Sequence, residues 1–157
     1  QVTLITEKCP VYGPEETKMY FVVNGKEHTA DSEAIVLKAD IKEDFSKMTA
    51  EEVQLAPIVE VVTVVNAGTA KAGKALKTKI GIKNAGINTL LIRRIYSNSP
   101  EIVLVPVKNV KSGKMEDLSL TINTTGMSAA QYSREVTIIT NDPKRSVVKV
   151  KVNWVVE

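Results

Sequence analysis

Residues 147–156 carry the pattern that most restricts how this chain folds, because their apolar and polar side chains alternate with a period of two. Every second residue from Val148 to Val156 is apolar, and the intervening positions include two lysines and an asparagine. Successive side chains of a β-strand point to opposite faces, so this segment predicts a strand with one buried and one exposed face. A helix would scatter the same apolar side chains around its circumference.

The same alternation recurs along the chain from residue 58 onward. The predicted strands of this part are 58–65, 76–82, 89–96, 102–105, 118–122, 136–140 and 147–156. Composition agrees, since the chain holds 22 Val, 13 Ile and 14 Thr against 9 Leu, and β-branched residues favour strands. About seven short strands separated by Gly, Asn, Ser and Pro predict an all-β, immunoglobulin-like Greek-key β-sandwich over 58–157. The register places these residues inward: Ile80, Ile82, Leu118, Leu120, Val150 and Trp154.

Residues 1–48 predict a partial β domain. Strands are expected at 2–6, 18–24 and 34–41, and about three strands are few for an independent core. Val2-Thr-Leu-Ile-Thr6 and Val136-Thr-Ile-Ile-Thr140 share one pattern, and each precedes a proline and another strand. Residues 1–48 are therefore interpreted as a partial Ig-like segment, the end of a first domain.

A short helix is predicted between the two parts. Thr49 and Glu52 form the Thr-x-x-Glu pattern of a capping box, and Pro57 ends the helical stretch. Residues 49–57 are therefore expected to be a connector that carries one or two helical turns.

Charge is distributed unevenly between the two parts. Residues 1–57 hold six lysines and eleven acidic residues, a net charge of −5, whereas residues 58–157 have a net charge of +8. Lys77, Lys79 and Lys83 are expected to share one outward strand face. That stripe is interpreted either as a solvated face that protects a sheet edge or as a surface for an anionic partner. Seven aromatic residues give little support for stacking on nucleic acid.

Catalytic and metal-binding patterns are weak. Gly68-x-x-x-x-Gly73-Lys74 approaches a phosphate-binding loop, but Ala75 replaces the Ser or Thr that would bind magnesium, and the alternation that follows predicts a strand rather than a helix. His28, the single histidine, follows the turn-forming pair Asn24-Gly25 and is expected in an exposed loop. No catalytic residue, metal site or cofactor is predicted.

Two further features have structural interpretations. Asn141-Asp142-Pro143 predicts an Asx-type turn rather than a ligand loop. Cys9 is the single cysteine, so no disulfide within the chain is expected, and the thiol is either idle or paired with another chain.

Three segments together resemble a known family: Gly68 to Gly73, Ile82-Lys-Asn-Ala-Gly-Ile-Asn-Thr-Leu-Leu-Ile92, and Val136 to Pro143. They are similar to the bacterial domain-of-unknown-function family numbered 1573. That family is common in exported proteins of Bacteroides-type bacteria and is related to Ig-like domains of cilia-associated proteins. Many members have Ser-Cys-Gly-Cys-Thr after the Leu-Val-Ile strand, where this chain has Arg93 to Ser99. The resemblance implies an Ig-like fold and a location in the periplasm or on the outer cell surface.

The expected function is that of a noncatalytic exported module, which binds or scaffolds a protein at the bacterial cell envelope. The alternative is a module that binds an anionic surface polymer or glycan through Lys77, Lys79 and Lys83. No nucleic-acid partner is expected. No membrane span is expected, because even the Val-rich run from residue 58 to residue 65 is interrupted by Glu60.

Overall fold

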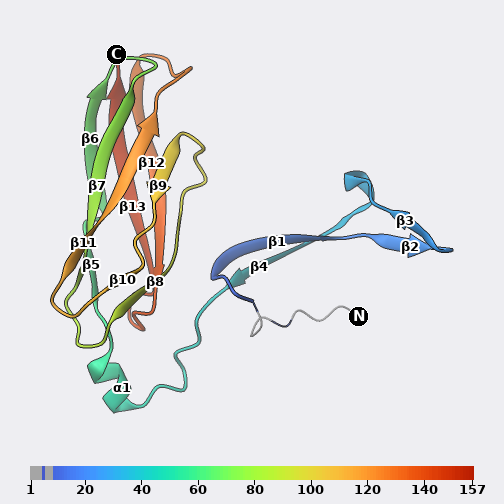
Figure 1. Ribbon diagram of the computed structural model, residues 1–157, viewed down its shortest axis with the longest axis horizontal. Helices are drawn as coiled ribbons and strands as arrows, with labels where there is room; N and C mark the ends of the chain where they lie inside the picture. Colours follow the sequence, from blue (N-terminus) through green and yellow to red (C-terminus); the bar gives the residue numbers. More distant parts are fainter. Residues whose placement is uncertain (1–4, 6–8) are drawn as a thin grey trace. The chain divides into compact units, whose positions relative to one another are not determined.

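The computed structural model describes residue 5 and residues 9–157 of this chain. The chain forms two compact units, Gln1–Glu43 and Asp44–Glu157. The connector predicted at 49–57 lies within the second unit, and the domain boundaries given by the sequence stay a prediction. Figure 1 shows the chain coloured from its amino to its carboxyl end.

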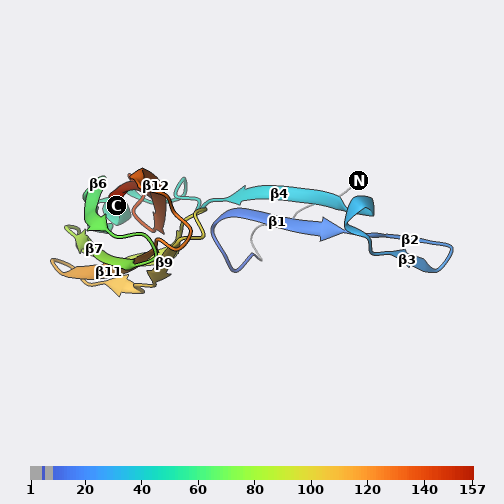
Figure 2. The same cartoon turned by 90° about the horizontal axis from the view of Figure 1, so that it is seen from above.

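The second unit is a β-sandwich of two sheets. A five-stranded sheet has the order β10-β8-β12-β13-β6, and a four-stranded sheet has the order β5-β7-β11-β9. Figure 2 shows the two layers from above, with β6 and β12 in one and β7, β11 and β9 in the other. The strands are β5 (Val59–Val61), β6 (Val64–Ala70), β7 (Ala75–Asn84), β8 (Leu90–Tyr96), β9 (Ile102–Val105), β10 (Asn109–Val110), β11 (Met115–Asn123), β12 (Ala130–Thr140) and β13 (Val147–Val156).

The core lies between these sheets and has the register that the alternation predicts. All six residues predicted to point inward are buried, with exposures between 0% and 2%. Trp154 stacks on Tyr132 with ring centroids 5.6 Å apart. The predicted all-β Ig-like sandwich is therefore confirmed.

The single strand predicted at 58–65 is wrong. The segment divides into β5, which pairs antiparallel with β7, and β6, which pairs in parallel with β13 in the other sheet. Val62, at the crossing, is 59% exposed. No Gly or Pro marks the crossing, and Val59, Val61 and Val65 are the less exposed residues on either side of it, although Thr63 between them is exposed. Periodicity reports which face a residue occupies, not which sheet its backbone joins.

The predicted connector helix is confirmed as α1 (Ala50–Leu55), which begins after the capping residue Thr49. The Glu52 N–H donates to Thr49 Oγ1 at 3.2 Å, and the Thr49 N–H donates to Glu52 Oε2 at 2.7 Å. These two bonds satisfy donors that the first helical turn leaves free. The backbone hydrogen bond from Thr49 is the main reason why the pKa of Glu52 lies below its ordinary value.

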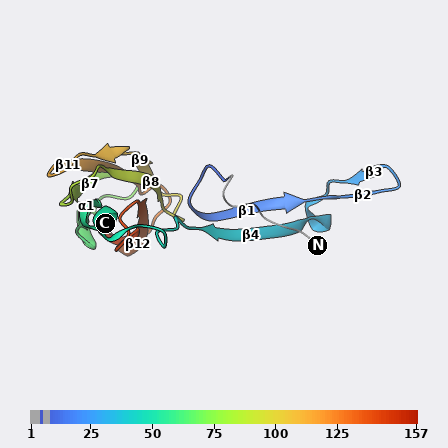
Figure 3. The ribbon, with the colours of Figure 1, turned by 90° about the horizontal axis from the view of Figure 1, so that it is seen from below.

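The first unit holds two antiparallel pairs: β1 (Gly13–Met19) with β4 (Ile35–Ile41), and β2 (Phe21–Val23) with β3 (Lys26–His28). Figure 3 shows β1 beside β4 and the β2–β3 hairpin. The strand predicted at 34–41 is thus confirmed as β4, whereas the predicted strand 2–6, apart from residue 5, lies outside the described residues.

The continuous strand predicted at 18–24 is wrong, because β1 ends at Met19 and β2 begins at Phe21. Asn24 and Gly25 both have positive φ, 50° and 77°. Two such residues form the tight turn that folds a strand back on itself, so Phe21–Val23 pair with Lys26–His28 instead of extending the β1–β4 ladder. Phe21, Val22 and Val23 are half exposed or more.

Gly86 is required by close packing rather than by a positive φ. A Cβ at this position would lie 2.4 Å from the Ala56 carbonyl oxygen and 2.5 Å from the Ile58 nitrogen. Both are backbone atoms, which cannot rotate away. The turn after β7 therefore touches the chain that follows α1, and only glycine allows that approach.

We expect Gly86→Ala to lower the free energy of unfolding by roughly 1–3 kcal/mol, because the new methyl group displaces the Ala56–Ile58 backbone. Urea unfolding measures it. Gly81→Ala is the matched control: its added Cβ would meet Met115 Sδ at 3.0 Å, the end of a flexible and exposed side chain. Equal losses in the two variants would contradict the close-packing argument.

A second prediction concerns the capping box. Because the folded pKa of Glu52 is lowered, its contribution to stability is present above the ordinary carboxyl pKa and is lost as pH falls through the folded pKa. An NMR titration should give Glu52 a midpoint below that of an ordinary glutamate. Thr49→Ala keeps the backbone N–H but removes the second cause, the bond from Thr49 Oγ1 to Glu52 Oε2 at 3.0 Å, so it should move the midpoint only part of the way back upward. A wild-type midpoint at the ordinary value would disprove the cap's electrostatic role.

Candidate functional site

Asn84, the buried last residue of β7, uses both ends of its side-chain amide on backbone groups. Its Oδ1 accepts from the N–H of Gly86 at 2.9 Å and from that of Ile58 at 3.3 Å. Its Nδ2 donates to the carbonyls of Asn88 at 2.8 Å and Val110 at 3.0 Å. These four bonds join the start of β5, the 84–88 turn and β10.

Asp142, in the turn that follows β12 of the other sheet, also bonds backbone groups. Its Oδ2 accepts from the Val59 N–H at 2.9 Å, and its Oδ1 accepts from the N–H groups of Lys144 and Arg145 at 2.8 and 3.2 Å. The bond to Lys144 confirms the predicted Asx-type turn. The neighbouring Asn141 Oδ1 accepts from the Leu91 N–H at 2.7 Å.

We call Asn84 and Asp142 the backbone clamp, because Asn84 accepts from the N–H of Ile58 and Asp142 accepts from the N–H of Val59. Asn84 is 0% exposed and Asp142 is 2% exposed. A buried polar side chain with all its partners in the backbone stabilises the fold and has little capacity left for a ligand. The Asn84-x-Gly86 and Thr140-Asn-Asp-Pro143 motifs of the sequence are therefore structural.

The three predicted lysines lie on the outer face of β7, and the structure pairs two of them. Lys79 Nζ lies 2.9 Å from Asp117 Oδ2 of β11, and Lys83 Nζ lies 2.7 Å from Glu60 Oε2 of β5. Among the described residues, no carboxylate forms an ion pair with Lys77. The stripe therefore presents one unpaired ammonium group instead of three.

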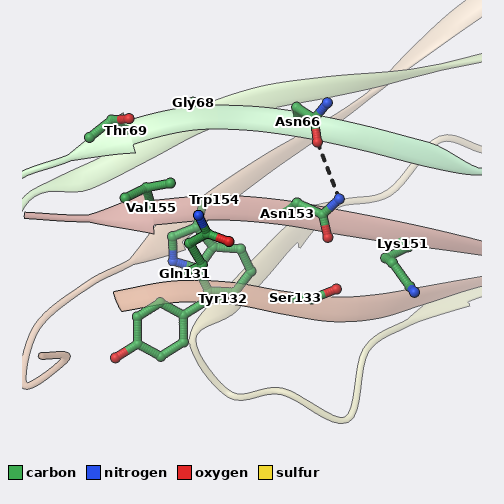
Figure 4. A pocket seen from close by; sticks show the side chains of 10 residues that line it. All are labelled: Asn66, Gly68, Thr69, Gln131, Tyr132, Ser133, Lys151, Asn153, Trp154 and Val155. Atoms are coloured by element: carbon green, nitrogen blue, oxygen red, sulfur yellow. Dashed lines mark hydrogen bonds between the residues drawn. The ribbon is translucent and has the colours of Figure 1, made fainter. Parts of the chain in front are cut away.

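A shallow depression on the outer face of the five-stranded sheet was not predicted from the sequence. It has a volume of about 690 Å³ and is lined by side chains from β6, β12 and β13. Asn153 Nδ2 donates to Asn66 Oδ1 at 3.2 Å across β13 and β6, and Lys151 lies on the same face of β13 (Figure 4). Gln131 and Ser133 of β12 are the other polar lining residues used below. We call this surface the amide depression.

Lys151 is the unpaired charge of the amide depression. Glu135 lies directly opposite Lys151 in the β12–β13 register, yet its carboxylate binds Lys149 Nζ at 2.9 Å. That hydrogen bond is the main reason why the pKa of Lys149 is raised. Within residues 9–157, no carboxylate forms an ion pair with Lys151.

The edge strand β9 exposes apolar side chains. Val103 and Val105 are 57% and 59% exposed, and β9 ends the order of its sheet, so one of its sides faces no other strand of the described sheets. Such an edge offers backbone groups for pairing with another chain.

The weaker candidates do not assemble into a site. His28 lies in β3, not in the predicted loop, and its Nδ1 is 3.2 Å from Glu33 Oε1. Gly68 belongs to β6, and the 71–74 turn leads into the strand β7 rather than a helix, as predicted. Cys9 is a half-buried free thiol.

Neither a cluster of metal ligands nor a membrane-spanning helix occurs in the described part of the chain. In the described part of the chain, no three or more His, Cys, Asp or Glu side chains are grouped closely enough to hold a metal ion. No helix among the same residues has the length and apolar character needed to span a membrane.

Comparisons with known proteins show which family and which solved structures the sandwich is similar to. A family model described as "HYDIN/CFA65/VesB-like, Ig-like domain" matches residues 57–153. A crystal structure of a Porphyromonas gingivalis W83 protein of unknown function has a TM-score of 0.71 at 20% identity, with 92% of this chain and 66% of that one covered. The chain thus spans just under two thirds of that protein's length.

Two more solved structures are similar at 10% identity. The ASH/PapD-like domain 7 of human CEP192 has a TM-score of 0.53, with 76% of this chain and 96% of that one covered. The Vibrio cholerae VesB protease has a TM-score of 0.49, with 63% of this chain and 31% of that one covered. No curated protein sequence matches the chain.

We expect Asn84→Ala to lower the free energy of unfolding by at least about 2 kcal/mol, because it leaves buried N–H and C=O groups without partners. Chemical denaturation measures the loss. Asn123→Ala is the matched control. Asn123 is exposed, and among the described residues its side chain bonds only the nearby Thr125 N–H, so its change should stay within about 0.5 kcal/mol. Similar losses of unfolding free energy in both variants would contradict a stabilising role of the buried hydrogen bonds of Asn84.

Proposed function

This chain belongs to the HYDIN/CFA65/VesB-like Ig-like domain family, and from that premise we propose that it is a noncatalytic module that binds or scaffolds another protein at the bacterial cell envelope. The observation that carries the proposal is the use of its polar motif residues. Asn84, Asn141 and Asp142 hydrogen-bond the sandwich's own backbone. The groups that meet a partner are therefore those of the outer faces and edges.

The edge strand β9 supports a protein partner. An extended segment of another chain gains main-chain hydrogen bonds by adding to a free sheet edge, and alternate side chains then set its specificity. Val103 and Val105 offer such a segment apolar contact beside the edge. Pro100 and Pro106 flank the strand, which limits the length of any added strand.

The envelope location rests on the resemblance to the family numbered 1573, whose members are common among exported proteins of Bacteroides-type bacteria. The segments that carry it are Gly68 to Gly73, Ile82 to Ile92 and Val136 to Pro143. A periplasmic or outer-surface location follows from that resemblance as part of the proposal.

The alternative function is binding of an anionic surface polymer or glycan through Lys77, Lys79 and Lys83. The common outer face of these lysines favours it. Because Lys79 and Lys83 are already paired with carboxylates, Lys77 would carry most of the attraction. Salt-sensitive retention on an acidic polysaccharide that Lys77→Gln abolishes would favour this alternative.

The proposed function is tested by site-specific photo-cross-linking in a Bacteroides-type bacterium. A photoreactive residue at Val103 should give a discrete adduct with one protein in the envelope fraction, because β9 is the pairing edge. Immunoblotting and mass spectrometry of the adduct provide the measurement.

Ile87 supplies the control position, since it is 60% exposed but lies in the turn between β7 and β8 and not on a strand. The same photoreactive residue there should give no adduct of that size. Adducts confined to the cytoplasmic fraction, or none from Val103, would refute the proposal.

A further inference from the structure

The amide depression has a chemistry that neither the backbone clamp nor the lysine stripe shares. Three side-chain amides, Asn66, Gln131 and Asn153, lie beside the Ser133 hydroxyl and the unpaired Lys151 ammonium. They come from three neighbouring strands, and Figure 4 shows the labelled side chains across the sheet. Both donors and acceptors are therefore offered over one continuous surface.

The position of this surface restricts its ligand. β13 pairs with β12 on one side and with β6 on the other, so its backbone groups are engaged in sheet hydrogen bonds. A peptide that recognises a sheet through main-chain bonds would use an edge, and the depression lies across the face instead. β6 is an edge of this sheet, but side chains of all three strands line the depression, so a ligand lying across the face is recognised chiefly through side chains.

Amide groups both donate and accept hydrogen bonds, which matches the hydroxyl groups of a sugar. The single ammonium group fits one carboxylate among many hydroxyls better than a densely charged polymer. Gly68, with a φ of 99° and nothing within 4 Å of an added Cβ, leaves the β6 side of the depression open. An extended chain can therefore lie across the sheet.

We propose that the amide depression binds an acidic saccharide, with Lys151 holding a carboxylate of the sugar and the amides of Asn66, Gln131 and Asn153 hydrogen-bonding its hydroxyls. This proposal rests on the noncatalytic binding role given above and assigns a ligand to a second surface. It differs from the lysine-stripe alternative, because β13 and β7 belong to different sheets.

The test is an NMR titration of the ¹⁵N-labelled full chain with two acidic probes, a hyaluronate tetrasaccharide and tetragalacturonate. Backbone amide signals of residues 66, 131, 133, 151 and 153 should shift with at least one of them at millimolar concentration. Chitotetraose, which lacks carboxylates, and a tetraglutamate peptide, which lacks sugar hydroxyls, should bind at least several-fold more weakly.

Two lysine variants identify the surface. Lys151→Gln should weaken binding roughly tenfold, because it removes a charge-assisted hydrogen bond. Lys77→Gln makes the same charge change at an unpaired lysine on the other sheet and should leave binding within about twofold, the change expected of a screened distant charge. Asn153→Ala should also weaken binding, and unchanged thermal unfolding midpoints should show that all three variants fold.

Several results would overturn the proposal: no shifts at these residues with either acidic probe, equal binding of chitotetraose or of tetraglutamate, or an equal effect of Lys77→Gln and Lys151→Gln. Tight binding of tetraglutamate at these residues would assign the surface to an acidic peptide instead. Failure of these titrations leaves the cross-link at Val103 as an independent test of the protein-binding role.

Discussion

Hydrogen bonds from the Ile58 and Val59 N–H groups to the side chains of Asn84 and Asp142 determine how this sandwich closes. The first strand of the sandwich must begin in one sheet and continue in the other. Its first segment, β5, has three residues and a buried start at Val59, where backbone donors need acceptors. Asn84 supplies one acceptor from the four-stranded sheet and Asp142 supplies another from the end of β12. Once β5 is fixed in this way, β6 can leave it and add in parallel to β13.

The alternation of side chains predicted the inward register of β7, β11 and β13, because each of these strands has one face in water and one in the core. It could not predict the crossing near Val62, since the period of two continues while the pairing partner changes. The break between Met19 and Phe21, where β1 ends and β2 begins, has a different physical reason. The sequence shows the Asn24-Gly25 turn, and this turn favours a local hairpin. Hydropathy alone favours one longer strand instead, so the two signals conflict.

For the lysine stripe, the sequence predicts which face the lysines share, but the pairing register of the strands determines their ion-pair partners. That Lys77, Lys79 and Lys83 share a face follows from their spacing alone. That Lys79 meets Asp117 and Lys83 meets Glu60 depends on which residues of β11 and β5 lie nearby. The amide depression lay further beyond sequence reasoning, because Asn66, Gln131 and Asn153 come from three strands that are neighbours only through sheet order. The alternation in β13 predicts that Lys151 and Asn153 point outward, but it does not predict which residues of β6 and β12 lie beside them.

These contacts indicate different roles for the two sets of polar residues: the buried ones stabilise the fold, and the outward ones are available for binding. The buried side chains of Asn84 and Asp142 are satisfied by the sandwich's own backbone, so changing them alters stability before it alters recognition. Outward residues such as Lys151 and Asn153 lie on the surface, where Asn153 bonds the outward Asn66, and they can change with little cost to the core. Under the proposed binding role, recognition falls to the outer face and the edge strand β9, where the fold constrains the sequence least, and the motifs around Asn84 and Asp142 report architecture rather than ligand.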